Sequence, residues 1–285
     1  MTPHRDYDRL FEILREMNSV AVAYSGGVDS ALVAKVAHDA LASRAVAVTS
    51  ISPTLPASQL QEAKEVAAGI GIRHLFVESD ELQIPGYAEN SANRCYLCKG
   101  DLYTLLIDVA RREGARHIVD GTHLDDLGDI RPGLAAARER GVRSPLVEAG
   151  LNKEAVRSLS RVLGLATWDK PASACLSSRF PRGTRITHAR LKQIESAEEV
   201  LRELGFRQFR VRYYDETARV ELAPEELRPL EADRRALLVA RIEACGFQQV
   251  TFDPAGYRPG GADRPGTEPI LLHQIDQMHP IHETK

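Results

Sequence analysis

The feature that most constrains the fold is a polar turn between two apolar segments, the hexapeptide Ser-Gly-Gly-Val-Asp-Ser at residues 25–30. Residues 20–23 are short and apolar, as in a buried strand, and residues 31–37 are apolar at helical spacing. A strand, a tight turn and a helix in this order direct unpaired backbone N–H groups and the positive end of the helix dipole at one point. This geometry suits a phosphate-binding turn, and the alternative is an ordinary strand-to-helix turn with a serine cap.

Each polar residue of the hexapeptide suits this task. Gly26 and Gly27 let the backbone approach a ligand closely, the hydroxyl groups of Ser25 and Ser30 can donate to phosphate, and Asp29 can hold Mg²⁺ beside it. The hexapeptide resembles the PP-loop of the ATP pyrophosphatases, which cleave ATP between its α and β phosphates. It lacks the Gly-Lys-Ser/Thr ending of a Walker loop and the third glycine of a dinucleotide fingerprint. ATP and Mg²⁺ are the cofactors that this resemblance implies.

The order of the predicted elements indicates an α/β fold. Apolar strands are predicted at residues 20–23, 45–51, 74–77 and 117–119, separated by helices that end near residues 41, 70 and 113, the last of which begins near residue 99. A further helix is predicted over residues 152–163, with Asn152 as its N-cap. This alternation is typical of a doubly wound parallel sheet, whose ligands bind beyond the carboxyl ends of the strands. Thr49 and Ser50 end the second strand, so they either lie near the adenosine or are ordinary strand-end residues. A polar stretch follows the fourth strand, where Asp125 and Asp126 are further candidates for positioning Mg²⁺.

The domain organisation follows from a change of composition after residue 168. We predict a PP-loop ATP-binding domain at 1–168, an active-site loop and junction rich in breakers at 169–187, and a smaller α+β domain at 188–285 for substrate binding and oligomerisation. In the last domain we expect a helix over 188–204, a hairpin at 209–222, a helix over 234–245 and a strand at 248–252. The tail from residue 254 is rich in glycine and proline and is expected to be loosely ordered.

Charge and hydropathy exclude several classes of partner. The 285 residues include 37 basic and 40 acidic side chains, and this balance provides no general attraction to nucleic acid. No apolar run reaches membrane-spanning length, and the first residues lack the apolar core of a signal peptide. We therefore expect a cytoplasmic protein with a small-molecule substrate and neither a nucleic-acid nor a membrane partner.

The cysteines indicate metal or sulfur chemistry. Cys95 and Cys98 form a Cys-x-x-Cys pair at the start of a helix, which suits iron–sulfur, zinc or dithiol chemistry, although it can also be incidental. Two ligands do not close a metal site, and Cys175, in the breaker-rich loop, is the natural third. Three cysteines and an open position suit a [4Fe–4S] cluster better than structural zinc. Cys245, beside a glycine at a helix end, is expected to be a small buried hydrophobe.

Arginines in the second domain indicate an anion site. Arg210 and Arg212 alternate along a predicted strand, so both side chains fall on one face of the sheet. Two such groups repel each other unless an anion lies between them, and phosphate matches the geometry of their forks. A solvated sheet face explains the pair almost as well. Arg258 is a weaker candidate for the same pocket.

Four motifs in order make the chain similar to the LarE family, ATP-dependent sulfur transferases of nickel-pincer nucleotide synthesis. They are the PP-loop, Asn-Arg-Cys-x-x-Cys-Lys at 93–99, Gly-Thr-x-x-Asp-Asp at 121–126 and Ala-Cys-Leu-Ser-Ser-Arg-Phe-Pro at 174–181. The resemblance implies that a carboxylate of pyridinium-3,5-biscarboxylic acid mononucleotide is adenylated, and that sulfur then converts it to a thiocarboxylate.

The resemblance also implies roles for individual residues. Cys175, with arginines such as Arg179 favouring its thiolate, is either a sacrificed sulfur donor or a ligand of a [4Fe–4S] cluster with Cys95 and Cys98. Arg210 and Arg212 would grip the substrate phosphate. One glutamate, at 195, 198 or 199, would enter the site, and the family implies a homo-oligomer, a hexamer.

Three other functions remain open from the sequence. They are a cluster-dependent tRNA thiolase, an amide-forming synthetase of the NAD- or GMP-synthase kind, and a module that senses ATP without cleaving it. The thiolase needs a basic surface, and the synthetase has no use for three clustering cysteines.

Overall fold

The computed structural model describes residues 3–128, 132–171 and 173–258. The chain divides into two compact units. Unit 1 comprises Met1–Tyr87 and Ala92–Ser173, and unit 2 comprises Ala88–Ser91 and Ala174–Lys285. Most of the tail expected to be loosely ordered lies outside the described residues.

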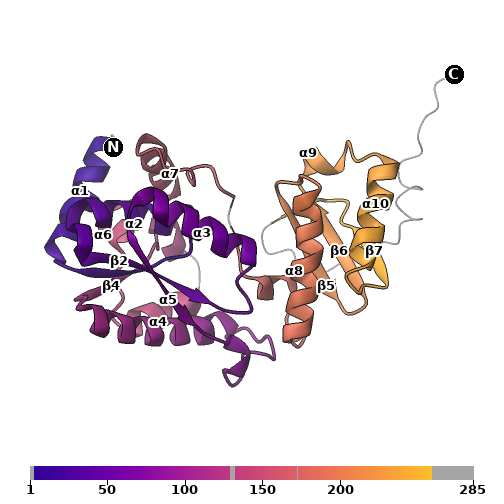
Figure 1. Ribbon diagram of the computed structural model, residues 1–285, viewed down its shortest axis with the longest axis horizontal. Helices are drawn as coiled ribbons and strands as arrows, with labels where there is room; N and C mark the ends of the chain where they lie inside the picture. The colour runs from indigo at the N-terminus through magenta and orange to yellow at the C-terminus, as the bar shows by residue number, and fades with distance from the viewer. Residues whose placement is uncertain (1–2, 129–131, 172, 259–285) are drawn as a thin grey trace. The chain divides into compact units, whose positions relative to one another are not determined.

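Unit 1 is built on a parallel sheet with helices on both faces (Figure 1). Its strands are β1 (Val20–Ala23), β2 (Ala45–Ile51), β3 (Arg73–Glu78) and β4 (His117–Val119). Its helices are α1 (Pro3–Glu16), α2 (Val28–Leu41), α3 (Ala57–Ile70), α4 (Arg94–Glu113), α5 (Pro132–Glu139), α6 (Pro145–Glu148) and α7 (Lys153–Val162). The predicted α/β class and doubly wound parallel sheet are confirmed.

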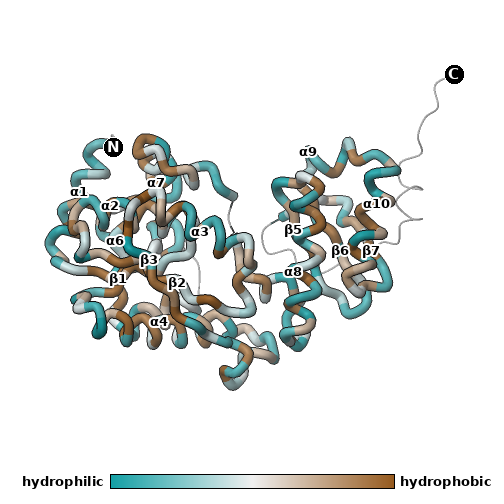
Figure 2. Tube along the Cα trace, viewed as in Figure 1, coloured by the Kyte–Doolittle hydropathy of each residue, from teal (hydrophilic) through white to brown (hydrophobic). Residues whose placement is uncertain are grey.

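Alternation along the central strands creates the two apolar layers. Val20 and Val22 of β1 pack with α1, α2, α3 and α7 on one face, whereas Ala21 packs with α4 and α5 on the other. Both central strands consist mainly of apolar residues because both of their faces are covered. Figure 2 shows this hydrophobic band along β1 and β2.

The strand order positions the ligand site. The order is β3-β2-β1-β4, so the chain adds strands on one side of β1 and then crosses to the other side to form β4. A doubly wound sheet binds its ligands at this switch point, beyond the carboxyl ends of the strands. The ends of β1 and β4 lead directly into the PP-loop, residues 25–30, and into the polar stretch that begins at Asp120.

Unit 2 is a small α+β unit. Its sheet contains β5 (Phe209–Tyr214), β6 (Thr217–Leu222) and β7 (Gln249–Phe252), in which β5 and β6 form the predicted hairpin and β7 is parallel to β6. Its helices are α8 (His188–Glu203), α9 (Pro224–Leu227) and α10 (Ala232–Glu243). Apolar residues of α8 and of one sheet face, including Ile194, Val211 and Tyr213, are buried, which leaves the opposite sheet face to polar side chains.

Two details differ from the sequence expectations. Helix α4 begins at Arg94, earlier than the expected residue 99, so the Cys-x-x-Cys pair lies inside its first turns. The short helices α5 and α6 were not predicted. No helix in the described ranges combines the length and the apolar character needed to cross a membrane.

Candidate active site

The two serines of the PP-loop hold the turn in shape. The hydroxyl of Ser30 accepts from the amide of Ser25 at 3.2 Å, donates to the carbonyl oxygen of Gly27 at 3.2 Å, and lies 3.1 Å from the Ser25 hydroxyl. Gly27 is the N-cap of α2, and in the described structure no side chain caps this helix start. The first amide groups of α2 and its dipole are therefore available to an anion.

Two glycines bring the loop close to its neighbours. Gly26 has a φ of +68°, and a Cβ atom there would lie 2.7 Å from the Cα and Cβ atoms of Ala63 in α3. Gly121 follows β4, and a Cβ atom there would lie 2.8 Å from the amide nitrogen of Ser30. Both positions therefore exclude a side chain, and the PP-loop is packed between α3 and the end of β4.

A cavity of about 510 Å³ opens in unit 1 at the switch point. Its walls include the predicted residues Ser25, Gly27, Asp29, Ser30, Thr49 and Ser50. Asp120, Thr122, Asp126, Cys95 and Lys99 complete the polar part of the lining. The volume lies within the range of ordinary ligand pockets.

Thr49 and Ser50 line the cavity and also form hydrogen bonds with residues at the ends of the neighbouring strands. The hydroxyl of Thr49 donates to the carbonyl oxygen of Tyr24 at 2.8 Å, so it accepts from Nε2 of His74, also at 2.8 Å. Burial, assisted by the charge of Lys64, lowers the pKa of His74 from 6.5 to about 4, which keeps this imidazole neutral. Ser50 pairs with Ser79 at 2.8 Å.

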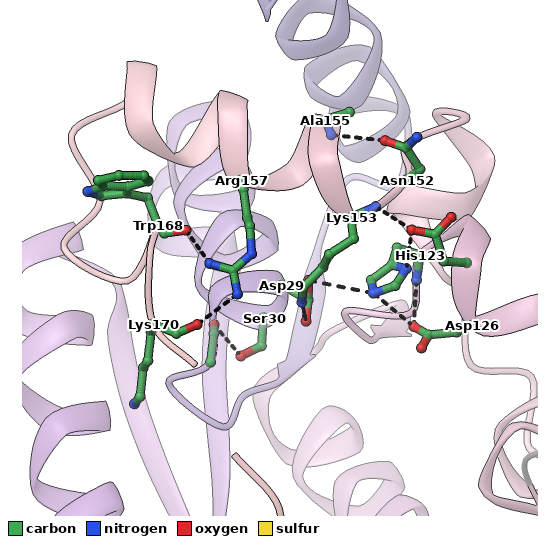
Figure 3. A network of polar contacts seen from close by, with 12 residues as sticks. Asp29, Ser30, His123, Asp126, Asn152, Lys153, Ala155, Arg157, Trp168 and Lys170 are labelled. Atoms are coloured by element: carbon green, nitrogen blue, oxygen red, sulfur yellow. Dashed lines mark hydrogen bonds and ion pairs between the residues drawn. The ribbon is translucent and has the colours of Figure 1, made fainter. Parts of the chain in front are cut away.

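Asp29 has a partner that the sequence did not indicate. Its two carboxylate oxygens lie 2.6 and 2.7 Å from Nζ of Lys153, the first residue of α7 (Figure 3). Nε2 of His123 lies 4.0 Å from Asp29 and 3.4 Å from Asp126, and Asp125 accepts from the amide of Lys153 at 2.8 Å. Lys153 directly follows a predicted N-cap, and this position alone does not point to Asp29.

Helix α7 also holds the chain that leads out of unit 1. Asn152 caps the helix as predicted, accepting from the amide of Ala155 at 2.9 Å. Arg157 donates to the carbonyl oxygens of Trp168 at 2.7 Å and of Lys170 at 2.8 Å (Figure 3).

One cysteine of the Cys-x-x-Cys pair lies in the wall of the same cavity. Cys95 is exposed and lines it, whereas Cys98 is half-buried with its sulfur 3.9 Å from a carboxylate oxygen of Glu81. None of the four cysteines, all of which lie in the described ranges, is part of a disulfide bond. No three His, Cys, Asp or Glu side chains in the described part of the chain are arranged to hold a metal ion. Cys245, expected to be buried, is half-buried.

Cys175 lies in unit 2, in a loop clamped by a buried ion pair. Arg179 is 1% exposed and donates to both carboxylate oxygens of Glu198, at 2.9 and 2.8 Å, and to the carbonyl oxygens of Ala174 and Cys175 at 2.6 and 2.9 Å. Burial opposes the charge of Arg179, but the attraction and hydrogen bonds of Glu198 outweigh it, so the pKa of Arg179 is raised. Of the three expected glutamates, Glu198 is therefore the one that binds an arginine of this loop. Glu195 pairs instead with Lys192, and Glu199 with Arg202.

Arg212 contacts the same loop from β5. Its Nη1 donates to the carbonyl oxygen of Ser178 at 2.9 Å, and its Nη2 to Glu221 at 2.8 Å. Glu221 also pairs with Arg219 at 3.2 Å. Nε of Arg212 is buried and has no hydrogen-bond partner in the described part of the chain. A buried donor of this kind calls for a partner beyond the protein's own groups, such as an ordered water or an anion.

Arg210 and Arg258 differ from Arg212 in their surroundings. The guanidinium group of Arg210 lies 4.9 Å from the centre of the Tyr257 ring. Burial and then the charge of Arg179 lower its pKa, so an anion beside it would be favoured. Arg258 is exposed.

Comparisons with known proteins cover different parts of the chain. A family model described as NAD synthase matches residues 11–94. An uncharacterised protein of Synechocystis is 45% identical over 258 residues, which cover 90% of this chain and 96% of that protein. A component of the glutamine-hydrolysing GMP synthase of Archaeoglobus fulgidus is 27% identical over 158 residues, which cover 50% of each chain.

One named relative extends over nearly the whole chain. The pyridinium-3,5-bisthiocarboxylic acid mononucleotide synthase of Lactiplantibacillus plantarum is 37% identical over 254 residues, which cover 88% of this chain and 91% of that enzyme. The PP-loop with its cavity and the Cys175 loop with its arginines both lie within a match of this extent. The chain therefore belongs to the LarE family of ATP-dependent sulfurtransferases.

Proposed function

We propose that the protein converts pyridinium-3,5-biscarboxylic acid mononucleotide to its thiocarboxylate form at the expense of ATP. A substrate carboxylate oxygen attacks the α-phosphorus of ATP, the bond to the β-phosphate oxygen breaks, and pyrophosphate leaves. A sulfur nucleophile then attacks the acyl carbon, and AMP leaves. The main support is the cavity of about 510 Å³ lined by the PP-loop at an uncapped helix start and by Asp29, whose carboxylate pairs with Lys153.

The nucleotide is expected to bind with its phosphates on the PP-loop. The amide groups at the start of α2 and the hydroxyl groups of Ser25 and Ser30 would bind the departing pyrophosphate, with Gly26 and Gly27 allowing the close approach. Lys153 would add a positive charge at the same place, because its ammonium group already lies beside this turn.

The carboxylates that line the cavity are suitable ligands for Mg²⁺. Asp29 and Asp126 both line it, and carboxylate oxygens are hard donors of the kind that Mg²⁺ prefers. The described residues provide no complete metal cage, which fits an ion bound partly through substrate phosphates. When bound, Mg²⁺ would neutralise charge on the phosphates, and Asp29 would then share its carboxylate between the ion and Lys153.

Unit 2 is proposed to bind the substrate's own phosphate. The unpartnered Nε of Arg212 and the lowered pKa of the half-buried Arg210 support an anion at this place. Arg258 remains a candidate for the same anion, although nothing in its surroundings favours it over other exposed arginines.

Two sources of sulfur remain in the proposal. In the sacrificial route, the Cys175 thiolate forms a thioester with loss of AMP. The Cβ–S bond then breaks as the Cα proton is removed, which leaves dehydroalanine and the thiocarboxylate. In the cluster route, Cys95, Cys98 and Cys175 would hold a [4Fe–4S] cluster, which would supply an additional sulfide taken up from inorganic sulfide, so that no cysteine is consumed.

The chain's own residues are consistent with part of the cluster set. Cys95 and Cys98 lie three residues apart near the start of α4, where two sulfur atoms fall on one side of the helix. These two thiols do not complete a site within unit 1, so the cluster route requires Cys175. Family analogy further suggests a homo-oligomer, a hexamer.

The test is anaerobic turnover with ATP, Mg²⁺ and the pyridinium biscarboxylate mononucleotide. We expect pyrophosphate release that depends on the second substrate, and a product in which sulfur replaces oxygen. Intact-protein mass and iron content separate the routes. Loss of one sulfur and two hydrogens at Cys175 shows the sacrificial route, whereas iron, acid-labile sulfide and an unchanged Cys175 show the cluster route. Absence of pyrophosphate release would refute the function, and salt-sensitive tRNA binding would favour a tRNA thiolase instead.

A further inference from the structure

Helix α7 is connected to the PP-loop in two ways. Directly, Lys153 binds Asp29 at 2.6 Å. Indirectly, Arg157 holds the backbone of residues 168–170, and from there Nζ of Lys170 donates to the carbonyl oxygen of Gly26 at 3.3 Å and pairs with Glu62 at 2.5 Å. The chain leading toward Cys175 is thus fastened beside the glycine turn before it leaves unit 1.

The chemistry of these contacts requires arginine at position 157. Its half-buried guanidinium group donates from two different nitrogens to the carbonyl oxygens of Trp168 and Lys170, at 2.7 and 2.8 Å. A planar fork can satisfy two acceptors at once in a fixed orientation, which a lysine ammonium group on a flexible stem does not. Both acceptors are backbone carbonyl oxygens, so the two hydrogen bonds fix the path of the main chain at residues 168–170.

We propose that Arg157 is a positioning residue for the sulfur-transfer step. By holding the backbone of residues 168–170 on α7, it fixes the last part of unit 1 from which the chain continues to Cys175, five residues after Lys170. The inference rests on the proposed function and adds to it a residue that links adenylation to sulfur delivery.

The consequence is a separation of the two chemical steps. Adenylation depends on the PP-loop, Asp29 and Lys153. The two backbone hydrogen bonds of Arg157 go instead to Trp168 and Lys170. Delivery of sulfur depends on where the Cys175 segment is held. Loss of Arg157 should therefore leave adenylation largely intact and allow more of the acyl-adenylate to be lost before sulfur arrives.

The experiment is a single anaerobic turnover of the full chain with ATP, Mg²⁺ and the pyridinium biscarboxylate mononucleotide. Pyrophosphate and thiocarboxylate are both quantified for the wild type, Arg157→Gln and Arg161→Gln. Arg161 is the matched control, because it lies one turn further along α7 and its guanidinium group stacks on the Trp168 ring at 5.0 Å. We expect thiocarboxylate formed per pyrophosphate to fall about tenfold in R157Q, in line with the effect of misplacing a reacting group. R161Q should keep the wild-type ratio.

The ratio distinguishes positioning from a structural role. A variant that merely folds less well loses both products in proportion, and an unchanged ratio in R157Q overturns the inference. An equal fall in R161Q also overturns it, because the effect would then not be specific to the two backbone hydrogen bonds of Arg157. If the wild type itself releases no pyrophosphate, the proposed function is refuted.

Discussion

Replacing Gly26 by alanine tests whether the PP-loop is as tightly confined as its geometry indicates. Gly26 has a φ of +68°, where an alanine is strained by about 1–2 kcal/mol. The new Cβ atom would also lie 2.7 Å from Cα and Cβ of Ala63, about 1 Å closer than an ordinary carbon–carbon contact. Because one of these atoms is helix backbone, the loop or α3 must shift, at a cost of about 1–3 kcal/mol.

Gly114 provides a matched control for the dihedral strain. Its φ is also +68°, and a Cβ atom there would meet nothing within 4 Å. Gly114→Ala should therefore lower the free energy of unfolding by about 1–2 kcal/mol, and Gly26→Ala by about 2–5 kcal/mol. Gly26→Ala should also weaken ATP binding, because the shifted turn no longer presents its amide groups correctly.

The assay is denaturant unfolding followed by the fluorescence of Trp168, the protein's single tryptophan, which lies in unit 1. Pyrophosphate release is measured on the same samples. If Gly26→Ala is no less stable than Gly114→Ala and keeps its affinity for ATP, the argument from crowding against Ala63 is wrong.

Three further predictions follow from the buried and paired charges. Lys153→Met should reduce pyrophosphate release about a hundredfold with far-UV circular dichroism unchanged, because it removes the cation beside Asp29, and a wild-type rate would contradict this role. Glu198→Gln should lower the free energy of unfolding by about 3 kcal/mol in chemical denaturation, because it leaves the charge of Arg179 buried without its counterion; a loss below about 1 kcal/mol would show that the pair is dispensable. The pKa of His74 falls from 6.5 to about 4 on folding, so protonation favours the unfolded chain: its contribution to stability is complete above pH 6.5 and declines as the pH falls toward 4. His74→Gln should flatten that part of a denaturation profile, and an unaltered slope would exclude this side chain as the cause.

The fold of unit 1 could be predicted because its signals are local. The strand, glycine turn and helix from residue 20 to residue 41 are contiguous, and their conformations follow from the preferences of neighbouring residues. The alternation of such units then restricts the sheet to parallel topology and its ligand site to one edge. Errors occurred where local signals conflict, as at the start of α4, where the expected first turn lay five residues too late.

Tertiary structure alone decided which charged groups meet. Lys153 is 124 residues from Asp29, and nothing in the spacing of either residue indicates their ion pair. Glu195, Glu198 and Glu199 were equivalent candidates in the sequence, but only Glu198 is on the helix face that meets Arg179. A turn is determined by dihedral preferences that each residue carries with it, whereas a long-range ion pair exists only after the sheet and its helices have brought distant segments together.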